Sequence, residues 1–261
     1  MEIHIRADEN EDALLDRSLA AFDEIERIGQ LMSFHDPESE LTRINQTAYR
    51  ETVPISPDMG RVLALAQSLH HASDGYFDPA IAPGLVRRGL LPEHGNSVTA
   101  ISNWKSVDLS ESSIRFAAPL KLDLGGIAKG YAVDRALSVI GNDVEATVNA
   151  GGDLAMTHWH GCHVEIRTPG SGGRDTLGVP MENRALATSA AYYLKDSHVI
   201  LDPHDWHPFA GQESVSVFAD SCVLADALTK ICLLLPDPSA LLRLHNATAF
   251  IIGLEGQTKR L

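Results

Sequence analysis

The stretch Val223–Leu234, VLADALTKICLL, is apolar at nearly every position except Asp226, Thr229 and Lys230. In an α-helix, residues three and four apart lie on one face, so these three side chains would form a polar stripe. Burying a carboxylate is costly unless it is paired or binds a metal ion. The stretch therefore predicts a buried helix in which Asp226 faces a specific partner.

The length of 261 residues suits one large domain or two small ones, and 44% hydrophobic with 21% charged residues is typical of a globular protein. We expect a single domain over residues 1–261, or two closely packed lobes within it. The formal net charge of −14 argues against nucleic acid or an anionic membrane as a partner, because both require a basic face. A small anionic ligand stays compatible with this charge if local cations or a metal ion offset it.

The three cysteines do not predict a disulfide framework. Cys222 and Cys232 are separated by ten residues of the predicted helix, roughly 15 Å along its axis, which is too far for a disulfide. The sequence shows neither a secretory signal pattern nor a run of membrane-spanning length. We expect a cytoplasmic protein, or an exported one if the sequence is a trimmed form.

Hydrophobic periodicity predicts a mixture of helices and strands in one compact α+β unit. Helices are expected over 10–31 and 56–73, the second beginning at the cap signal Ser56-Pro57. Residues 105–117 predict a hairpin, and residues 121–140 predict a strand, a glycine turn and a helix. Further strands are expected at 1–7, 145–156, 163–168, 198–202, 215–219 and 248–253.

The segment LDLGGIAKGYAVDRA has the strongest chemical signal. Gly125 and Gly126 precede a predicted helix, where backbone N–H groups can approach an anion, and Lys129 adds a point charge for a phosphate. The glycine spacing fits neither a Walker loop nor a Rossmann fingerprint. A phosphate site and an ordinary tight turn both remain open.

Other motifs have a functional and a structural interpretation. The pair Gly151-Gly152 fits a turn or bulge. SDGYFDPAIAP offers an aromatic ring and Asp78 to a planar ligand, or anchors a loop in the core. His198, which begins HVILDP, suits a general base or a structural histidine. HWHGCH, residues 158–163, suggests a metal site, although adventitious metal binding is the more common outcome.

Several segments, taken together and in order, resemble the ApbE family, the FAD:protein FMN transferases: MSFHDPESELTRIN, SDGYFDPAIAPGL, LKLDLGGIAKGYAVDRA, VNAGGDLAM, ALATS, HVILDP and SCVLADAL. The resemblance covers about residues 32–230. It implies a bilobed, T-fold-like α+β fold with mixed β-sheets and flanking helices, and an FAD cleft between the lobes.

The resemblance also implies an activity and a set of site residues. FAD would be cleaved at its pyrophosphate, FMN transferred to a threonine hydroxyl of a target redox protein, and AMP released, with Mg²⁺ as cofactor. His198 would be the catalytic base, and the Ala128 carbonyl and Asp226 carboxylate the metal ligands. The implied FAD contacts are Met32, Phe77, Asp78, Asp123, Lys129, Thr188 and Ile200.

The chain departs from the family pattern at Lys230, where the family usually has a threonine that binds the metal. Lys230 lies four residues after Asp226 and would pair with it. Two hypotheses follow for the catalytic pair Asp226 and Lys230. In one, the ammonium takes the cation position. In the other, Lys230 turns aside and Asp226 still binds magnesium.

Smaller departures lie at Ala190-Ala191 and at residues 204–207 (HDWH), close to the expected flavin or acceptor site. Two alternative functions stay open. One is an FAD pyrophosphatase that uses water as acceptor, and the other is an FAD-binding protein whose turnover is weakened by Lys230.

Overall fold

A computed structural model describes residues 1–8, 10–95, 97–169, 175–190 and 200–261. The chain divides into two compact units, each of which we describe by itself. Unit 1 comprises Met1–Arg27, Lys129–Tyr193 and Gly211–Leu261, and unit 2 comprises Ile28–Ala128 and Leu194–Ala210. The expected single domain over residues 1–261 stays a prediction.

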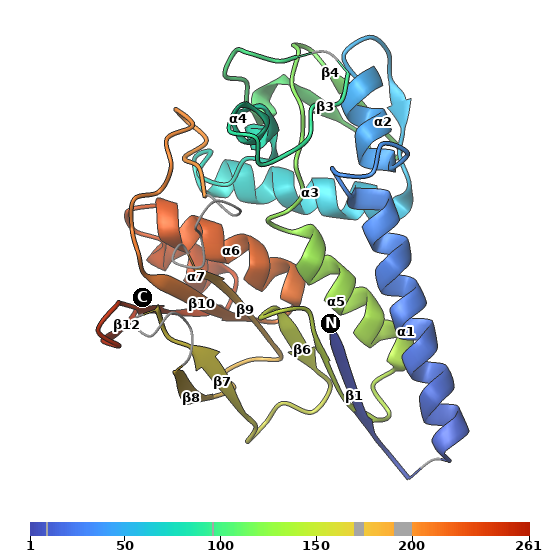
Figure 1. Ribbon diagram of the computed structural model, residues 1–261, viewed down its shortest axis with the longest axis vertical. Coiled ribbons are helices and arrows are strands. Elements are labelled where there is room, and N and C mark those ends of the chain that lie inside the picture. The colour runs from blue at the N-terminus through green and yellow to red at the C-terminus, as the bar shows by residue number, and fades with distance from the viewer. Residues whose placement is uncertain (9, 96, 170–174, 191–199) are drawn as a thin grey trace. The chain divides into compact units, whose positions relative to one another are not determined.

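Unit 1 is built on a seven-stranded sheet of order β1-β5-β6-β9-β10-β11-β12. The first and last strands of the chain form its opposite edges (Figure 1). Its strands are β1 (Glu2–Arg6), β5 (Glu145–Asn149), β6 (Leu154–Met156), β9 (Ala185–Ala190), β10 (Ser214–Ala219), β11 (Thr248–Ile252) and β12 (Thr258–Arg260). All these pairings are antiparallel, whereas the family resemblance implied mixed sheets.

Helices and a hairpin complete unit 1. The apolar face of α5 (Ala128–Ile140) packs in a core with β1, β5 and the middle of α1 (Glu11–Met32), at Ala21 and Ile25. Helix α6 (Cys222–Leu234) packs against β9 and β10, and α7 (Ser239–Leu244) contacts β11. The hairpin of β7 (His163–Arg167) and β8 (Thr176–Pro180) contributes to a second core with β6, β9 and β10.

Helices α5 and α6 approach each other closely at Gly130. A Cβ atom at this position would lie 2.2 Å from the carbonyl oxygen of Cys222, a distance that no side chain can adopt without a backbone shift. Asp134 of α5 accepts hydrogen bonds from the backbone N–H groups of Cys222 and Val223, both at 2.9 Å. It thereby caps the beginning of α6 from a neighbouring helix.

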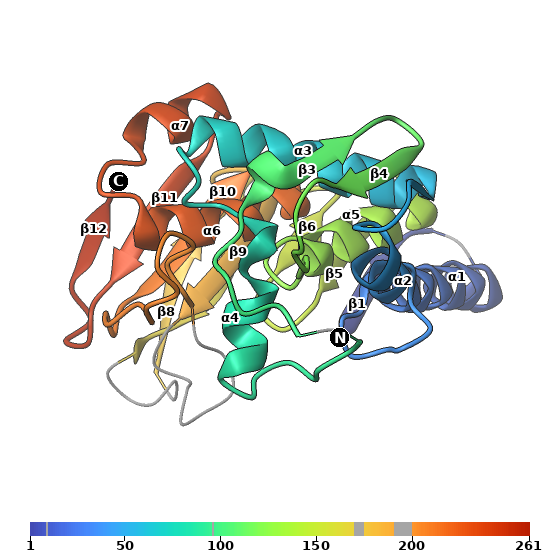
Figure 2. The ribbon, with the colours of Figure 1, turned by 90° about the horizontal axis from the view of Figure 1, so that it is seen from above.

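Unit 2 combines short helices with a small sheet of order β2-β4-β3. Helix α3 runs beside the β3–β4 hairpin (Figures 1 and 2). The elements of unit 2 are α2 (Glu40–Thr47), β2 (Val53–Pro54), α3 (Pro57–Ala72), η1 (Pro79–Ile81), α4 (Ala82–Arg87), η2 (Trp104–Ser106), β3 (Val107–Leu109) and β4 (Ser113–Phe116). As predicted, the Ser56 side chain caps α3 and Pro57 is its first residue.

The α+β class is confirmed, and the strand predicted directly before Gly125-Gly126 is wrong. Of the strand predicted over 198–202, the structure describes residues 200–202, which form only an isolated bridge of Leu201 with Pro208. Residues 121–124, expected as a strand before the glycine pair, form no strand. The Asn45 side chain instead binds both the N–H and the carbonyl of Leu122, and the Asp123 N–H donates to Pro79. These partners satisfy the backbone that a strand would otherwise pair. No helix among the described residues is long and apolar enough to cross a membrane.

We predict that Gly130→Ala destabilises the protein by about 1–3 kcal/mol or more, because the added methyl overpacks the α5–α6 contact. Urea unfolding followed by circular dichroism measures this effect. Gly29→Ala in α1 is the matched control, since no atom lies within 4 Å of the position that its Cβ would take, and we expect it to be neutral or stabilising by about 1 kcal/mol or less. Equal stability of the two variants would contradict the close contact.

Candidate functional site

In the polar stripe of α6, Asp226 faces the beginning of α5, whereas Thr229 faces β9. The Asp226 side chain is fully buried, and its Oδ1 atom pairs with the Lys230 ammonium at 2.5 Å. Its Oδ2 atom accepts a hydrogen bond from the Gly130 N–H at 3.2 Å. The predicted i,i+4 pair of Asp226 and Lys230 is therefore confirmed, and both carboxylate oxygens have partners.

A second ion pair lies beside the first. The Lys129 ammonium contacts Oδ2 of Asp153, which follows the turn between β5 and β6. Gly151 and Gly152 adopt positive φ angles of 71° and 110° in this turn, a conformation that glycine adopts without strain. The sequence analysis noticed the two glycines of VNAGGDLAM but missed Asp153, although an acidic residue directly after a glycine turn was a usable signal.

The four residues Lys129, Asp153, Asp226 and Lys230 form what we call the charge quartet. The side chains of Lys129 and Lys230 are 52% and 21% exposed, whereas those of Asp153 and Asp226 are 2% and 0% exposed. Burial lowers the pKa of Lys129, but attraction to Asp226 and Asp153 outweighs it and leaves this pKa raised. The quartet thus holds two charged ammonium groups toward solvent above two buried carboxylates.

Thr229 and Thr188 have structural partners away from the quartet. The Thr229 hydroxyl donates to the Asp226 carbonyl at 2.6 Å and bonds the Ser189 hydroxyl at 2.7 Å. Successive strand residues face opposite sides of a sheet, so Thr188 points away from α6. Its hydroxyl bonds that of Ser216 on β10 at 2.8 Å. The structure does not bring Thr188 together with Lys129 and Asp226.

The implied magnesium ligands do not fit a divalent cation as they stand. Oδ1 of Asp226 is paired with an ammonium group and Oδ2 with a backbone N–H. Ala128 is the first residue of α5, where a helical carbonyl accepts the N–H four residues later. The described residues also contain no group of three or more His, Cys, Asp or Glu that could hold a metal ion.

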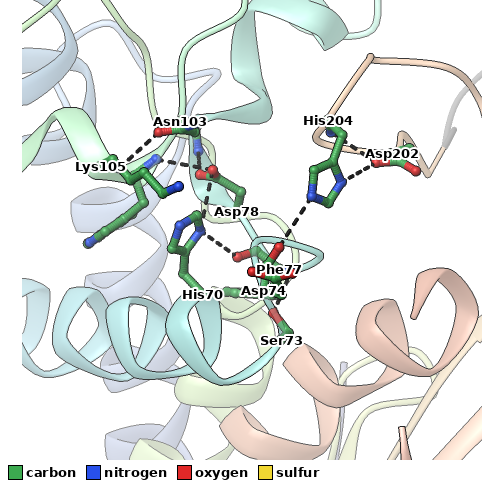
Figure 3. Close-up of polar contacts among 11 residues, drawn as sticks. His70, Ser73, Asp74, Phe77, Asp78, Asn103, Lys105, Asp202 and His204 are labelled. Atoms are coloured by element: carbon green, nitrogen blue, oxygen red, sulfur yellow. Dashed lines mark hydrogen bonds and ion pairs between the residues drawn. The ribbon is translucent and has the colours of Figure 1, made fainter. Parts of the chain in front are cut away.

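In unit 2, Asp78 is turned inward onto a buried histidine (Figure 3). Its Oδ1 accepts from the Ala80 N–H at 2.8 Å, and its Oδ2 accepts from the Trp104 N–H at 3.1 Å and lies 3.4 Å from Nδ1 of His70. Burial raises the pKa of Asp78 and lowers that of His70. The Asp78 carboxylate therefore joins the beginning of η1 to the beginning of η2. A contact of Asp78 with FAD stays a prediction.

The other predicted flavin residues of unit 2 are partly brought together. Phe77 is buried and donates its N–H to Ser73 at 3.0 Å. Asp123 lies close to this loop because its N–H donates to Pro79, which follows Asp78. Met32 is the buried last residue of α1, and the Ile200 carbonyl accepts from Phe209. His198 lies outside the described residues.

His204, in the segment that departs from the family pattern, joins two loops of unit 2 (Figure 3). Its Nδ1 lies 2.8 Å from Oδ1 of Asp202 and its Nε2 lies 3.2 Å from the Asp74 carbonyl. Because an ionised carboxylate and a carbonyl only accept, both ring nitrogens must donate, which requires the charged imidazolium. The hydrogen bond to Asp202 accordingly raises the pKa of His204.

Two further features lie apart from these residues. A cavity of about 440 Å³ in unit 2 is lined by residues including Arg87, Lys121 and Trp206, but by none of the predicted site residues. In HWHGCH, the Trp159 and His160 rings stack at 3.8 Å and the segment turns before β7. His158 and His160 therefore lie outside any strand.

The chain matches known proteins over most of its length. The ApbE family profile matches residues 1–251. The chain belongs to the ApbE family. FAD:protein FMN transferases from Klebsiella pneumoniae and Chlamydia trachomatis are 27% and 29% identical to it, covering 83% and 78% of this chain and 75% and 71% of theirs.

Solved ApbE structures share the fold. The flavin transferase ApbE from Vibrio cholerae has a TM-score of 0.80 at 22% identity, covering 99% of this chain and 92% of its own. The ApbE protein from Thermotoga maritima has a TM-score of 0.80 at 24% identity, covering 98% and 91%. The family assignment and the α+β fold expected from the sequence are confirmed.

We predict that His204 titrates above its ordinary pKa of 6.5. Because the folded-state pKa is raised, its stabilisation is fully present below the unfolded-state pKa and is lost as pH rises through the folded-state pKa. NMR titration of the His204 ring measures this, with assignment by His204→Gln. Asp202→Asn should lower the measured pKa, whereas Asp108→Asn on β3 should leave it unchanged. An ordinary pKa that Asp202→Asn does not alter would contradict the bridge.

Proposed function

We propose that this chain is an FAD:protein FMN transferase, which transfers FMN from FAD to a threonine hydroxyl of an acceptor protein and releases AMP. The relatives from Klebsiella pneumoniae and Chlamydia trachomatis bear this name. The observation that carries the proposal is the charge quartet in a chain whose family profile match covers residues 1–251.

The quartet suits the diphosphate group of FAD. Lys129 and Lys230 present two ammonium groups at a partly exposed surface, and buried Asp153 and Asp226 hold them in place. Ammonium groups bind phosphate oxygens through charge-assisted hydrogen bonds. Fixed cations that face the developing charge of a phosphoryl transfer also lower its barrier. Both lysines therefore act on the diphosphate, Lys129 as a binding residue and Lys230 as a catalytic one.

The transfer breaks one bond and forms one bond. The acceptor threonine oxygen attacks the phosphorus atom of the FMN half, and the bond from this phosphorus to the bridging oxygen breaks. AMP leaves with that oxygen, and the threonine proton passes to His198 as general base. Met32, Phe77, Asp78, Asp123, Thr188 and Ile200 remain predicted contacts of FAD.

The proposal predicts that a threonine-containing acceptor peptide incubated with FAD and the protein gains the mass of FMN, with an equal amount of AMP released. Lys129→Met should slow this transfer by about a hundredfold, because it removes a cation from the diphosphate. Mass spectrometry and AMP chromatography measure both products.

Two controls accompany this experiment. A peptide with alanine in place of threonine should gain no mass, and Lys259→Met on β12, which changes an exposed lysine outside the quartet, should transfer at the wild-type rate. Release of free FMN and AMP without peptide modification would show an FAD pyrophosphatase and refute the transferase.

A further inference from the structure

We propose that Lys230 occupies the position of a divalent cation at Asp226, so that this chain binds the diphosphate of FAD without a metal ion. The inference rests on the proposed function, since it concerns how the same site receives FAD. The family resemblance implies Mg²⁺ as cofactor, whereas here the Lys230 ammonium takes the place of that ion.

Both oxygens of the Asp226 carboxylate already have partners. A magnesium ion lies about 2.0–2.1 Å from its oxygen ligands. The Lys230 nitrogen lies 2.5 Å from Oδ1 of Asp226, so an ion at this oxygen would overlap the ammonium group. Oδ2 accepts the Gly130 N–H, which the close packing of α5 and α6 fixes in place. A metal ion can therefore bind Asp226 only after Lys230 leaves.

The charges of the quartet are already balanced without a metal ion. Asp153 and Asp226 are buried, and each is already neutralised by one ammonium group, from Lys129 and Lys230 respectively. Magnesium dehydrates reluctantly, and in proteins it is usually bound through one or two carboxylates together with substrate phosphates. A divalent ion entering the quartet would gain no uncompensated negative charge from the protein and would be repelled by the two ammonium groups.

Lys230 retains a donor for a ligand. An ammonium group has three N–H donors. Lys230 directs its nitrogen to Oδ1 of Asp226 and, at 3.3 Å, to the Asp226 carbonyl. In the part of the chain that the structure describes, it has no further hydrogen-bond partner. With 21% of its side chain exposed, Lys230 can offer the third donor to a phosphate oxygen.

Calorimetric titration with FAD in EDTA and in excess Mg²⁺ tests the inference. We expect the wild-type affinity to agree within about threefold between the two conditions, because no metal site is available to respond. Lys230→Thr should bind FAD about tenfold or more weakly in EDTA, since a charge-assisted hydrogen bond is lost, and should recover when Mg²⁺ is added. Lys259→Thr is the matched control and should behave as wild type.

Binding of Mn²⁺ without FAD, followed by electron paramagnetic resonance, provides a second readout. Wild type should bind no Mn²⁺ at the quartet, and Lys230→Thr should acquire a site. Lys230→Thr leaves Asp226 buried without its cation, which destabilises the fold. If this variant does not fold, the wild-type measurements of FAD and Mn²⁺ binding still decide whether Asp226 binds a metal ion.

The outcomes separate this inference from the proposed function. Wild-type FAD affinity that rises about tenfold or more with Mg²⁺, or wild-type Mn²⁺ binding that Asp226→Asn abolishes, would overturn the lysine-for-metal inference and leave the transferase intact. If wild type binds FAD in neither condition, the proposed function and the inference both fail.

Discussion

The site depends on the close approach of α5 and α6, in which each helix supplies a carboxylate to the beginning of the other. Asp134 of α5 accepts the first N–H groups of α6, and Asp226 of α6 accepts the Gly130 N–H near the beginning of α5. Negative charge at a helix N-terminus is favourable, because the first N–H groups lack helical partners. Only glycine at position 130 leaves room for this contact, since a Cβ there would overlap Cys222.

This contact explains how a buried carboxylate supports a cationic surface. Asp226 is fixed by Gly130 on one oxygen and holds the Lys230 ammonium on the other. Asp153 holds Lys129 in the same way from the glycine turn between β5 and β6. A chain with a net charge of −14 can thus receive an anionic nucleotide, because its local cations are positioned by buried carboxylates rather than by excess basic residues.

The sequence predicted those features that local pattern determines. The 3.6-residue period predicted α1 and α3, the Ser56-Pro57 signal predicted the start of α3, and i,i+4 spacing predicted the pair of Asp226 and Lys230. It could not predict contacts made across long sequence separations. The Asn45 side chain bonds the N–H and carbonyl groups of Leu122 that a neighbouring strand would otherwise pair. Asp153 contacts Lys129 because the pairing of β5 with β6 places the turn between them beside α5. Helix α2 was missed because the polar residues before it resemble a turn, although Ser39 caps it.

The most direct test of the account is a crystal structure of the wild-type protein grown with FAD and Mn²⁺, examined by anomalous diffraction. We expect no manganese peak at Asp226, and we expect the Lys230 ammonium to lie between this carboxylate and a phosphate oxygen of FAD. A manganese ion bound to Asp226, with Lys230 turned away from it, would contradict the central claim that a lysine serves as the cation of this site.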